Sequence, residues 1–112
     1  MKIAIPSTSD GKVSPHFGHS EKVAIVNVEG NEIKSIYFEE MPDHTPGLIP
    51  QWLIERGVNV VLASGIGQKA IHYFSLGGVK VIAGVSPELE CKVAAEKYLN
   101  GTLQTDDNLC DH

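Results

Sequence analysis

The stretch "VNVVLASGIGQKAIHYFSLGGVKVIAG", Val58 to Gly84, carries the pattern that decides the fold. It opens with a run of β-branched and apolar residues over 58–63, typical of a buried strand, and closes with a second such run over 79–83. Between them, apolar residues recur at the spacing of one helix face, at Ala70, Ile71 and Phe74, and Gly77-Gly78 ends the helix. A strand, a helix and a strand in this order predict a right-handed crossover between parallel strands of one sheet.

Three further strands are expected before this stretch, over residues 1–6, 23–28 and 33–38. The turn residues Glu29-Gly30-Asn31 join the second and third of them in a hairpin. A helix with one apolar face is expected to begin near Thr45-Pro46, since a capping hydroxyl before a proline suits a helix start, and to end at Arg56-Gly57. A hairpin therefore precedes the crossover unit.

The last helix is predicted from Pro87 to about Asn100, with Gly101 as its cap. Its apolar stripe consists of Cys91, Ala94, Ala95 and Tyr98. The full order is strand, strand, strand, helix, strand, helix, strand, helix. This order predicts a three-layer α/β fold, in which helices lie on both faces of a five-stranded mixed sheet and the second strand alone is antiparallel.

The length and composition fit one globular domain. The chain has 112 residues, 42% of them hydrophobic and 21% charged, and we expect residues 1–103 to form one domain and 104–112 a flexible tail. The formal net charge is −5 and Lys and Arg form no cluster, which argues against nucleic acid and anionic membranes as partners. No apolar run approaches the ~20 residues that span a bilayer, and the start turns polar after Pro6, so we expect a cytoplasmic protein.

The strand directions bring several loops to one end of the predicted sheet. If all strands except the second run the same way, the segments that follow them leave at their carboxyl ends, where open α/β sheets bind ligands. These segments are the loop 7–22 with His16 and His19, the loop 41–46 with His44, and the turn 64–67 with Gly65 and Gly67. All three helices are expected to begin at this end, with their free amide N–H groups facing the same space.

Three motifs resemble one known family. They are "HFG" at 16–18, "GIGQKAIHYF" at 65–74 followed by "LGGVKVIAG" at 76–84, and "AAEKYLNGTL" at 94–103. In these motifs the chain, over residues 2–103, is similar to the dinitrogenase iron–molybdenum cofactor biosynthesis family. The resemblance implies a ribonuclease H-like α/β fold. Nitrogenase-linked members of that family carry or accept the iron–molybdenum cofactor or its precursor cluster, another relative holds a mixed molybdenum–copper sulfide cluster, and many stand-alone members have no assigned function.

The resemblance places His16 at the family's histidine, and the terminal "CDH" resembles a short form of the Cys/His-rich tails of some members. The expected cofactor contacts are His16, Phe17, Gly18, His44, Gly65 and Gly67. The expected metal ligands are His16, His44, Cys110 and His112. Plainer interpretations stay open: either histidine can be a backbone-bonded or surface residue, the glycine turn a tight connection, and the terminal Cys-x-His a chance pattern.

Four other side chains have expected places. Phe17 buries its ring and anchors the loop, while His19 makes structural hydrogen bonds at the loop exit. His72 is solvated, and Cys91 is a small buried hydrophobe in the apolar stripe. The tail starts at the far end of the last helix, yet about ten extended residues reach ~33 Å, enough to return past a sheet ~20 Å tall. Whether the tail closes over the site stays open.

Enzyme chemistry finds little support in the sequence. A ribonuclease H-type nuclease needs strand carboxylates for Mg²⁺, and the strands over 3–6 and 58–63 contain none. No Ser/His/Asp or Cys/His nucleophile pair has supporting context. We therefore expect a non-catalytic carrier of an iron–sulfur or molybdenum–iron–sulfur cluster, a monomer or weak dimer whose partner is a cluster donor or acceptor protein. The alternatives are an interaction or regulatory module that binds no cluster, and a small-anion or nucleotide sensor that uses the glycine turn.

Overall fold

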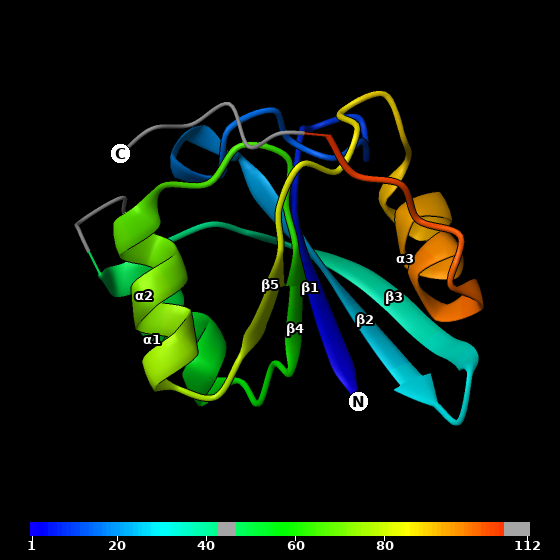
Figure 1. Cartoon of the computed structure of the whole chain (residues 1–112), viewed down its shortest axis with the longest axis horizontal. Helices are drawn as coiled ribbons and strands as arrows, with labels where there is room; N and C mark the ends of the chain where they lie inside the picture. Colours follow the sequence, from blue (N-terminus) through cyan, green and yellow to red (C-terminus); the bar gives the residue numbers. More distant parts are fainter. Residues whose placement is uncertain (43–46, 107–112) are drawn as a thin grey trace.

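The computed structural model describes residues 1–42 and 47–106, and Figure 1 shows their arrangement. The strands within these residues are β1 (Lys2–Ser7), β2 (Lys22–Glu29), β3 (Glu32–Glu40), β4 (Val60–Leu62) and β5 (Lys80–Ile82). The helices are α1 (Leu48–Glu55), α2 (Gln68–Leu76) and α3 (Cys91–Asn100), and a 3₁₀ turn, η1 (Phe17–His19), lies between β1 and β2. This is the predicted order of elements with η1 added.

The strands form one mixed sheet in the order β3-β2-β1-β4-β5. β2 pairs antiparallel with both β1 and β3, whereas β4 pairs parallel with β1 and with β5. β2 alone therefore opposes the other strands, which confirms the predicted topology. The strand order is compatible with the ribonuclease H-like fold that the resemblance implies.

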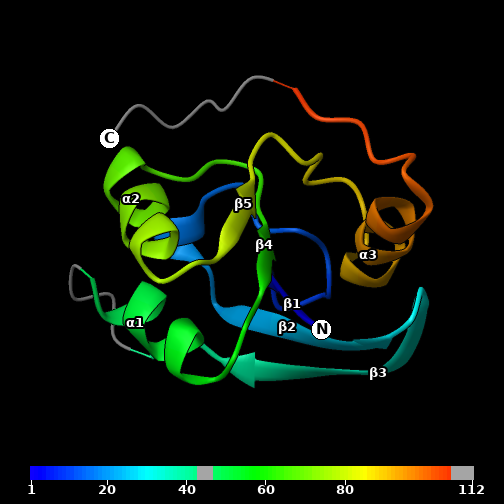
Figure 2. The same ribbon diagram turned by 60° about the horizontal axis from the view of Figure 1, so that its bottom comes forward.

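Helices cover both faces of the sheet, α1 and α2 on one face and α3 on the other (Figures 1 and 2). Each face has its own apolar core. The larger side chains of the α1–α2 core include Phe17, Ile25, Leu53, Ile66 and Phe74. The α3 core includes Ile5, Val26 and Leu62 from the sheet, with Cys91, Ala94 and Ala95 from the helix. The predicted three layers and the predicted apolar stripe of the last helix are both confirmed.

The last helix begins later than the sequence predicts, at Cys91 rather than at Pro87. The residues before it bond to the β1–β2 connection instead. The Val13 N–H donates to the Leu89 carbonyl at 2.9 Å, and the Cys91 N–H donates to the Gly11 carbonyl at 3.0 Å. Residues 87 and 88 form a turn, in which the Leu89 N–H donates to the Ser86 carbonyl at 3.3 Å, so tertiary pairing overrides the local helix signal.

All three helices are short, from 8 residues in α1 to 10 in α3. α1 begins at Leu48, after Gly47 in the left-handed conformation with φ at 82°. Its predicted start at Thr45-Pro46 lies outside the described residues. No helix in the described part of the chain has the length and apolarity that crossing a bilayer requires.

Candidate functional site

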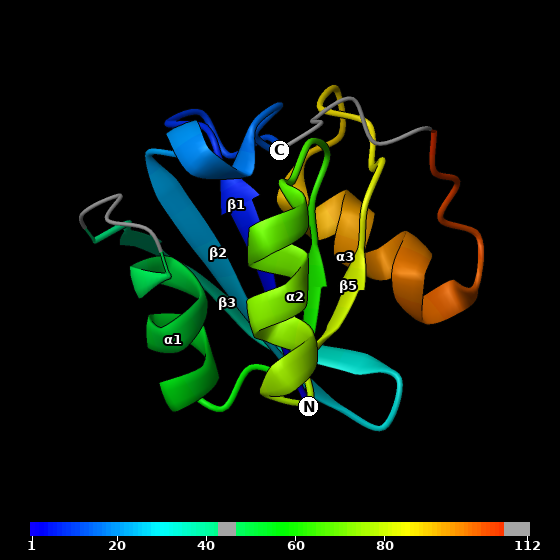
Figure 3. The ribbon, with the colours of Figure 1, turned by 60° about the vertical axis from the view of Figure 1, so that its left-hand side comes forward.

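One end of the sheet collects the connections that the strand directions predict. The register pairs Ser7 with Lys22 and Lys22 with Glu40, so the carboxyl ends of β1 and β3 lie at the same end. β4 and β5 run parallel to β1. Figure 3 shows the β1–β2, β4–α2 and β5–α3 connections gathered at the top of the molecule. The convergence of these connections follows from strand direction alone.

The loop with His16 bonds directly to the glycine turn after β4. The Phe17 N–H donates to the Gly65 carbonyl at 2.7 Å, and the Gly65 N–H donates to the Pro15 carbonyl at 3.0 Å. The two bonds make a parallel bridge between His16 and Gly65. The structure therefore brings together two segments that the sequence assigns to one site, although β2, β3, α1 and β4 lie between them along the chain.

Two buried hydroxyl groups hold this loop in one shape. The Ser14 hydroxyl donates to the His16 carbonyl at 3.0 Å. The Ser20 hydroxyl donates to the Phe17 carbonyl at 2.8 Å and lies 3.1 Å from the His16 carbonyl. Both serines are buried, with 4% and 2% of their surface exposed. Neither was predicted to matter, although hydroxyl side chains that flank a turn are common partners for its carbonyls.

The Phe17 ring anchors the loop to the core, as the sequence predicts. It is 6% exposed and meets the Phe74 ring edge to face, with 5.8 Å between ring centroids. Such an aromatic pair adds about 0.5–1.5 kcal/mol beyond its burial. Phe17 thus acts on this site by positioning the loop, because its ring faces the α1–α2 core and its N–H is bonded to Gly65.

His16 and His19 both lie at the surface of the η1 turn, and both are exposed. Their rings meet edge to face with centroids 6.1 Å apart. The backbone N–H of His19 donates to the His16 carbonyl at 3.1 Å, which keeps the two residues on one turn. The side chain of His19 is therefore a surface neighbour of His16. The signal for this pairing in the sequence is the spacing of three residues, which matches one 3₁₀ turn.

α2 begins directly after the glycine turn that contacts the histidine loop. Its N-cap, Gly67, is extended and supplies no side-chain cap. The first amide groups of a helix have no partner within the helix and carry partial positive charge. The start of α2 therefore offers hydrogen-bond donors to an anion beside His16.

The other two helices do not begin beside His16, which corrects the expectation that all three helix starts would face the same space. A Cβ at Gly47, the N-cap of α1, would lie 3.4 Å from the Tyr73 ring in the second half of α2, so α1 begins farther down the sheet. α3 begins on the opposite face, where its first N–H donates to Gly11. Helix starts follow the packing of each helix, which strand direction does not fix.

The chain returns to this end of the sheet after α3. The Asp106 N–H donates to the Gly84 carbonyl at 2.7 Å, and Thr105 forms an antiparallel bridge with Val85. The Gly84 N–H in turn donates to the Ser64 carbonyl at 2.9 Å. Four segments therefore lie side by side, in the order tail, β5–α3 connection, β4–α2 turn and histidine loop.

The remaining predicted ligands fall outside this description. His44, Cys110 and His112 lie outside the described residues. Within residues 1–42 and 47–106, no three His, Cys, Asp or Glu side chains come together in a way that could hold a metal ion. His72 is exposed on α2, as predicted.

Cys91 belongs to the core and not to the site, which confirms its predicted place. It is fully buried in the α3 core. Burial raises the pKa of its thiol to about 11, and a hydrogen bond with Ser7 acts weakly in the opposite direction. A thiol of this kind stays protonated at neutral pH and is a poor metal ligand.

Comparisons with known proteins find relatives of this chain in sequence and in fold. The sequence profile of a family described as "Dinitrogenase iron-molybdenum cofactor" matches residues 1–101. The uncharacterized protein MJ0580 of Methanocaldococcus jannaschii is 34% identical over 110 residues, covering 93% of this chain and 90% of the relative. The crystal structure of PH0822 is 34% identical with a TM-score of 0.86, over 95% of this chain and 96% of that one. The apo form of the orange protein from Desulfovibrio gigas shares the fold, with 22% identity and a TM-score of 0.78 over 96% and 93% of the two chains.

Proposed function

Because the chain belongs to the dinitrogenase iron–molybdenum cofactor family, we propose that it is a non-catalytic carrier of a metal–sulfur cluster. The cargo is an iron–sulfur or molybdenum–iron–sulfur cluster, which the protein receives from a donor protein and releases to an acceptor protein in the cytoplasm. One observation carries the proposal: the bridge between His16 and Gly65 holds an exposed imidazole beside the start of α2.

This site offers a ligand for the metal atoms of such a cluster and hydrogen-bond donors for its sulfides. A neutral imidazole is a ligand for iron and other transition metals, so His16 binds a metal atom. The sulfides carry negative charge, and the amide N–H groups at the start of α2 are hydrogen-bond donors for them. The net charge of −5 does not oppose this, because salt screens exposed charges beyond ~10 Å at 0.1 M.

Release of the cargo follows from the same geometry. His16 is exposed, and the Ser14 and Ser20 hydroxyls fix its backbone before any ligand arrives. A preorganised loop loses little entropy on binding, so a few ligands suffice for a useful affinity. Few and accessible ligands also leave room for an acceptor protein to substitute its own.

The tail and the loop after β3 supply the other proposed ligands. The segment with Asp106 and the histidine loop are the first and last of the four neighbouring segments at this end of the sheet, so three inter-segment spacings separate them. Neighbouring strands are ~4.8 Å apart, so this separation is ~14 Å, and the four residues from Asp106 to Cys110 span ~13 Å when extended. We propose that Cys110 and His112 reach the cluster in this way, and that His44 is a second imidazole ligand.

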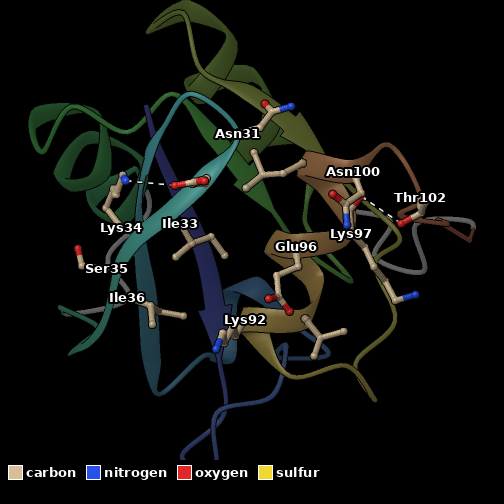
Figure 4. Close-up of a pocket in the computed structure, with 13 residues that line it drawn as sticks. Asn31, Ile33, Lys34, Ser35, Ile36, Lys92, Glu96, Lys97, Asn100 and Thr102 are labelled. Atoms are coloured by element: carbon tan, nitrogen blue, oxygen red, sulfur yellow. Dashed lines mark hydrogen bonds and ion pairs between the residues drawn. The ribbon is translucent and has the colours of Figure 1, made fainter.

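A groove between β3 and α3 favours a second candidate function, a protein-interaction module (Figure 4). It has a volume of about 890 Å³, an apolar lining from Ile33 and Ile36 of β3, and Lys92, Glu96 and Lys97 along α3. β3 is an edge strand, which a partner chain can extend. In a carrier, this groove would seat the donor or acceptor protein.

Anaerobic purification with elemental analysis tests the proposal. We expect iron or molybdenum together with acid-labile sulfide in a fixed ratio to the protein chain, and a visible absorption band that disappears on exposure to acid. A protein that stays colourless and free of metal, both as purified and after reconstitution with iron, thiomolybdate and sulfide, contradicts the carrier proposal. The interaction module would then be the better candidate.

A further inference from the structure

We infer that His16 and His19 form a two-imidazole chelate for a single late first-row transition-metal ion, with copper bound most tightly. This site takes one ion directly from solution or from a partner. It deepens the proposed function, because it lies on the same loop, and it assigns His19 a ligand role that the sequence did not suggest.

The first argument is the turn that carries the two histidines. His16 immediately precedes η1 and His19 ends it. His16 is the extended N-cap of this turn and its carbonyl accepts the N–H of His19, so the two residues close one turn of chain and their rings lie together. The ring centroids are accordingly 6.1 Å apart.

This separation is close to that of two imidazoles on one metal ion. With metal–nitrogen bonds of about 2.0–2.1 Å, each ring centre lies about 3.2 Å from the ion, so two rings lie about 5 Å apart on a tetrahedral ion and about 4.5 Å apart at adjacent positions of a square-planar Cu²⁺. The remaining gap of about 1–1.6 Å closes by rotation of the two side chains, which their exposure permits.

The second argument is the rigidity of the backbone between the two rings. The His16 carbonyl accepts from the His19 N–H at 3.1 Å and from the Ser14 hydroxyl at 3.0 Å. The intervening Phe17 ring is buried against Phe74. The turn therefore fixes the backbone at both histidines before binding, so that binding a metal ion orders only the two side chains.

The chemistry of the pair sets the class of ion. Imidazole suits copper, zinc, nickel and iron, and affinity for a nitrogen site peaks at Cu²⁺ among the divalent first-row ions. No third His, Cys, Asp or Glu side chain of the described residues completes the site. Coordination positions on the ion therefore stay open for sulfide, or for a thiolate of a partner.

The test uses the full chain with the other proposed ligands removed by Cys110→Ser, His112→Ala and His44→Ala, so that these residues contribute nothing to the measured metal binding. In this parent, Cu²⁺ and Zn²⁺ are titrated calorimetrically, and the Cu²⁺ complex is examined by electron paramagnetic resonance. His16→Ala and His19→Ala are introduced separately, with His72→Ala as the control because His72 is an exposed histidine on α2. Circular dichroism confirms that every variant is folded.

We expect one Cu²⁺ per chain, bound more tightly than Zn²⁺, with nitrogen coupling from two imidazoles. Each single variant at the pair should weaken Cu²⁺ binding at least about tenfold and leave coupling from one imidazole, because a linked second ligand acts at high effective concentration. His72→Ala should match the parent. Equal Cu²⁺ affinity in the parent and in His19→Ala overturns the inference, and the 6.1 Å approach is then only an aromatic contact.

Cluster uptake by the wild-type chain separates this inference from the proposed function. Two-imidazole Cu²⁺ binding together with an absence of any cluster uptake contradicts the carrier and supports the chelate. Cluster uptake together with Cu²⁺ binding that ignores His19→Ala contradicts the chelate and leaves the carrier standing.

Discussion

Ser20 has more influence on the candidate site than its chemistry alone suggests. Its buried hydroxyl donates to the carbonyl of Phe17 and lies 3.1 Å from the carbonyl of His16. It therefore holds the backbone that carries the His16 side chain. Hydrogen bonds to a loop backbone are invisible in a single sequence, since any serine near a turn is a candidate. The sequence therefore predicted His16 as a site residue but gave no role to the serines that hold its backbone.

Ser20→Ala should weaken cluster and copper binding while the protein stays folded. The change leaves a buried carbonyl with one partner fewer, so unfolding free energy should fall by about 1–2 kcal/mol. Ser75→Ala is the matched control, because Ser75 is exposed on α2. Denaturant unfolding and calorimetric titration measure the two effects. Loss of stability with unchanged binding would show that the hydroxyl only stabilises the fold.

Cys91 shows a residue whose place the sequence does predict. Its position in a stripe with Ala94 and Ala95 indicated burial, and the structure buries all three completely. A helix face is a local pattern with a fixed period, which explains why this prediction holds. Because burial raises the pKa of its thiol from 9.0 to about 11, Cys91 also makes stability depend on alkaline pH.

Wild-type stability should fall between pH 9 and pH 11 more steeply than that of Cys91→Ala. Below pH 9 the thiol is protonated in the folded and in the unfolded chain. Between the two pKa values the unfolded chain releases the proton and the folded chain retains it, so unfolding becomes easier by something on the order of 2 kcal/mol.

Cys91→Ala should itself cost about 1 kcal/mol at neutral pH through lost packing, and should leave cluster uptake unchanged. Urea unfolding at several pH values measures both quantities. If the stability of the two proteins changes with pH in parallel, the raised pKa of the Cys91 thiol is contradicted. If Cys91→Ala cannot take up a cluster, the placement of Cys91 outside the site is contradicted.

At the scale of elements, the strand positions and the start of α2 after Gly67 were predictable, and the start of α3 was not. Strands follow runs of β-branched and apolar residues, and the structure keeps all of those predicted, with changes only at their ends. The start of α3 moved to Cys91 because Leu89 bonds Val13 across the fold. Such long-range bonds have no signature in the segment that they reshape.

The path of the chain after α3 is the other feature that the sequence did not predict, since residues 104–112 were expected to form a flexible tail. Thr105 and Asp106 bond to the β5–α3 connection at Gly84 and Val85, which gives this stretch a defined path along the end of the sheet. Gly84 makes the contact possible. Its φ is +80°, and a Cβ there would lie 1.8 Å from the Asp106 carbonyl oxygen.

Gly84→Ala should detach Thr105 and Asp106 from the sheet and weaken cluster uptake. Gly78→Ala is the matched control, since its φ is +77° and nothing lies within 4 Å of the added Cβ. Both variants carry the strain of a left-handed alanine, about 1 kcal/mol, but only the first has the clash. Hydrogen exchange at the Asp106 amide measures detachment. Equal protection of this amide in both variants would contradict the contact.

At the scale of the whole molecule, the sheet topology could be predicted from the sequence because a small number of strand connections determines it. One crossover unit and one hairpin fix the strand directions, and the directions bring the β1, β4 and β5 connections to one end. The two hydrogen bonds that Gly65 makes, one from the Phe17 N–H and one to the Pro15 carbonyl, are a consequence of that arrangement. The pairing of His16 with His19 was missed, because their spacing of three residues places the rings together only when the chain between them forms a tight turn.

Uptake of a metal–sulfur cluster by His16→Ala tests most directly that the histidine loop is the cargo site. Wild type, His16→Ala and the control His72→Ala are reconstituted anaerobically with iron, thiomolybdate and sulfide, and bound metal and sulfide are measured per folded chain. We predict that His72→Ala takes up as much as wild type and that His16→Ala retains about a tenth or less, because the fixed imidazole ligand is gone. Equal uptake by His16→Ala and wild type would contradict the assignment of this loop as the cluster site.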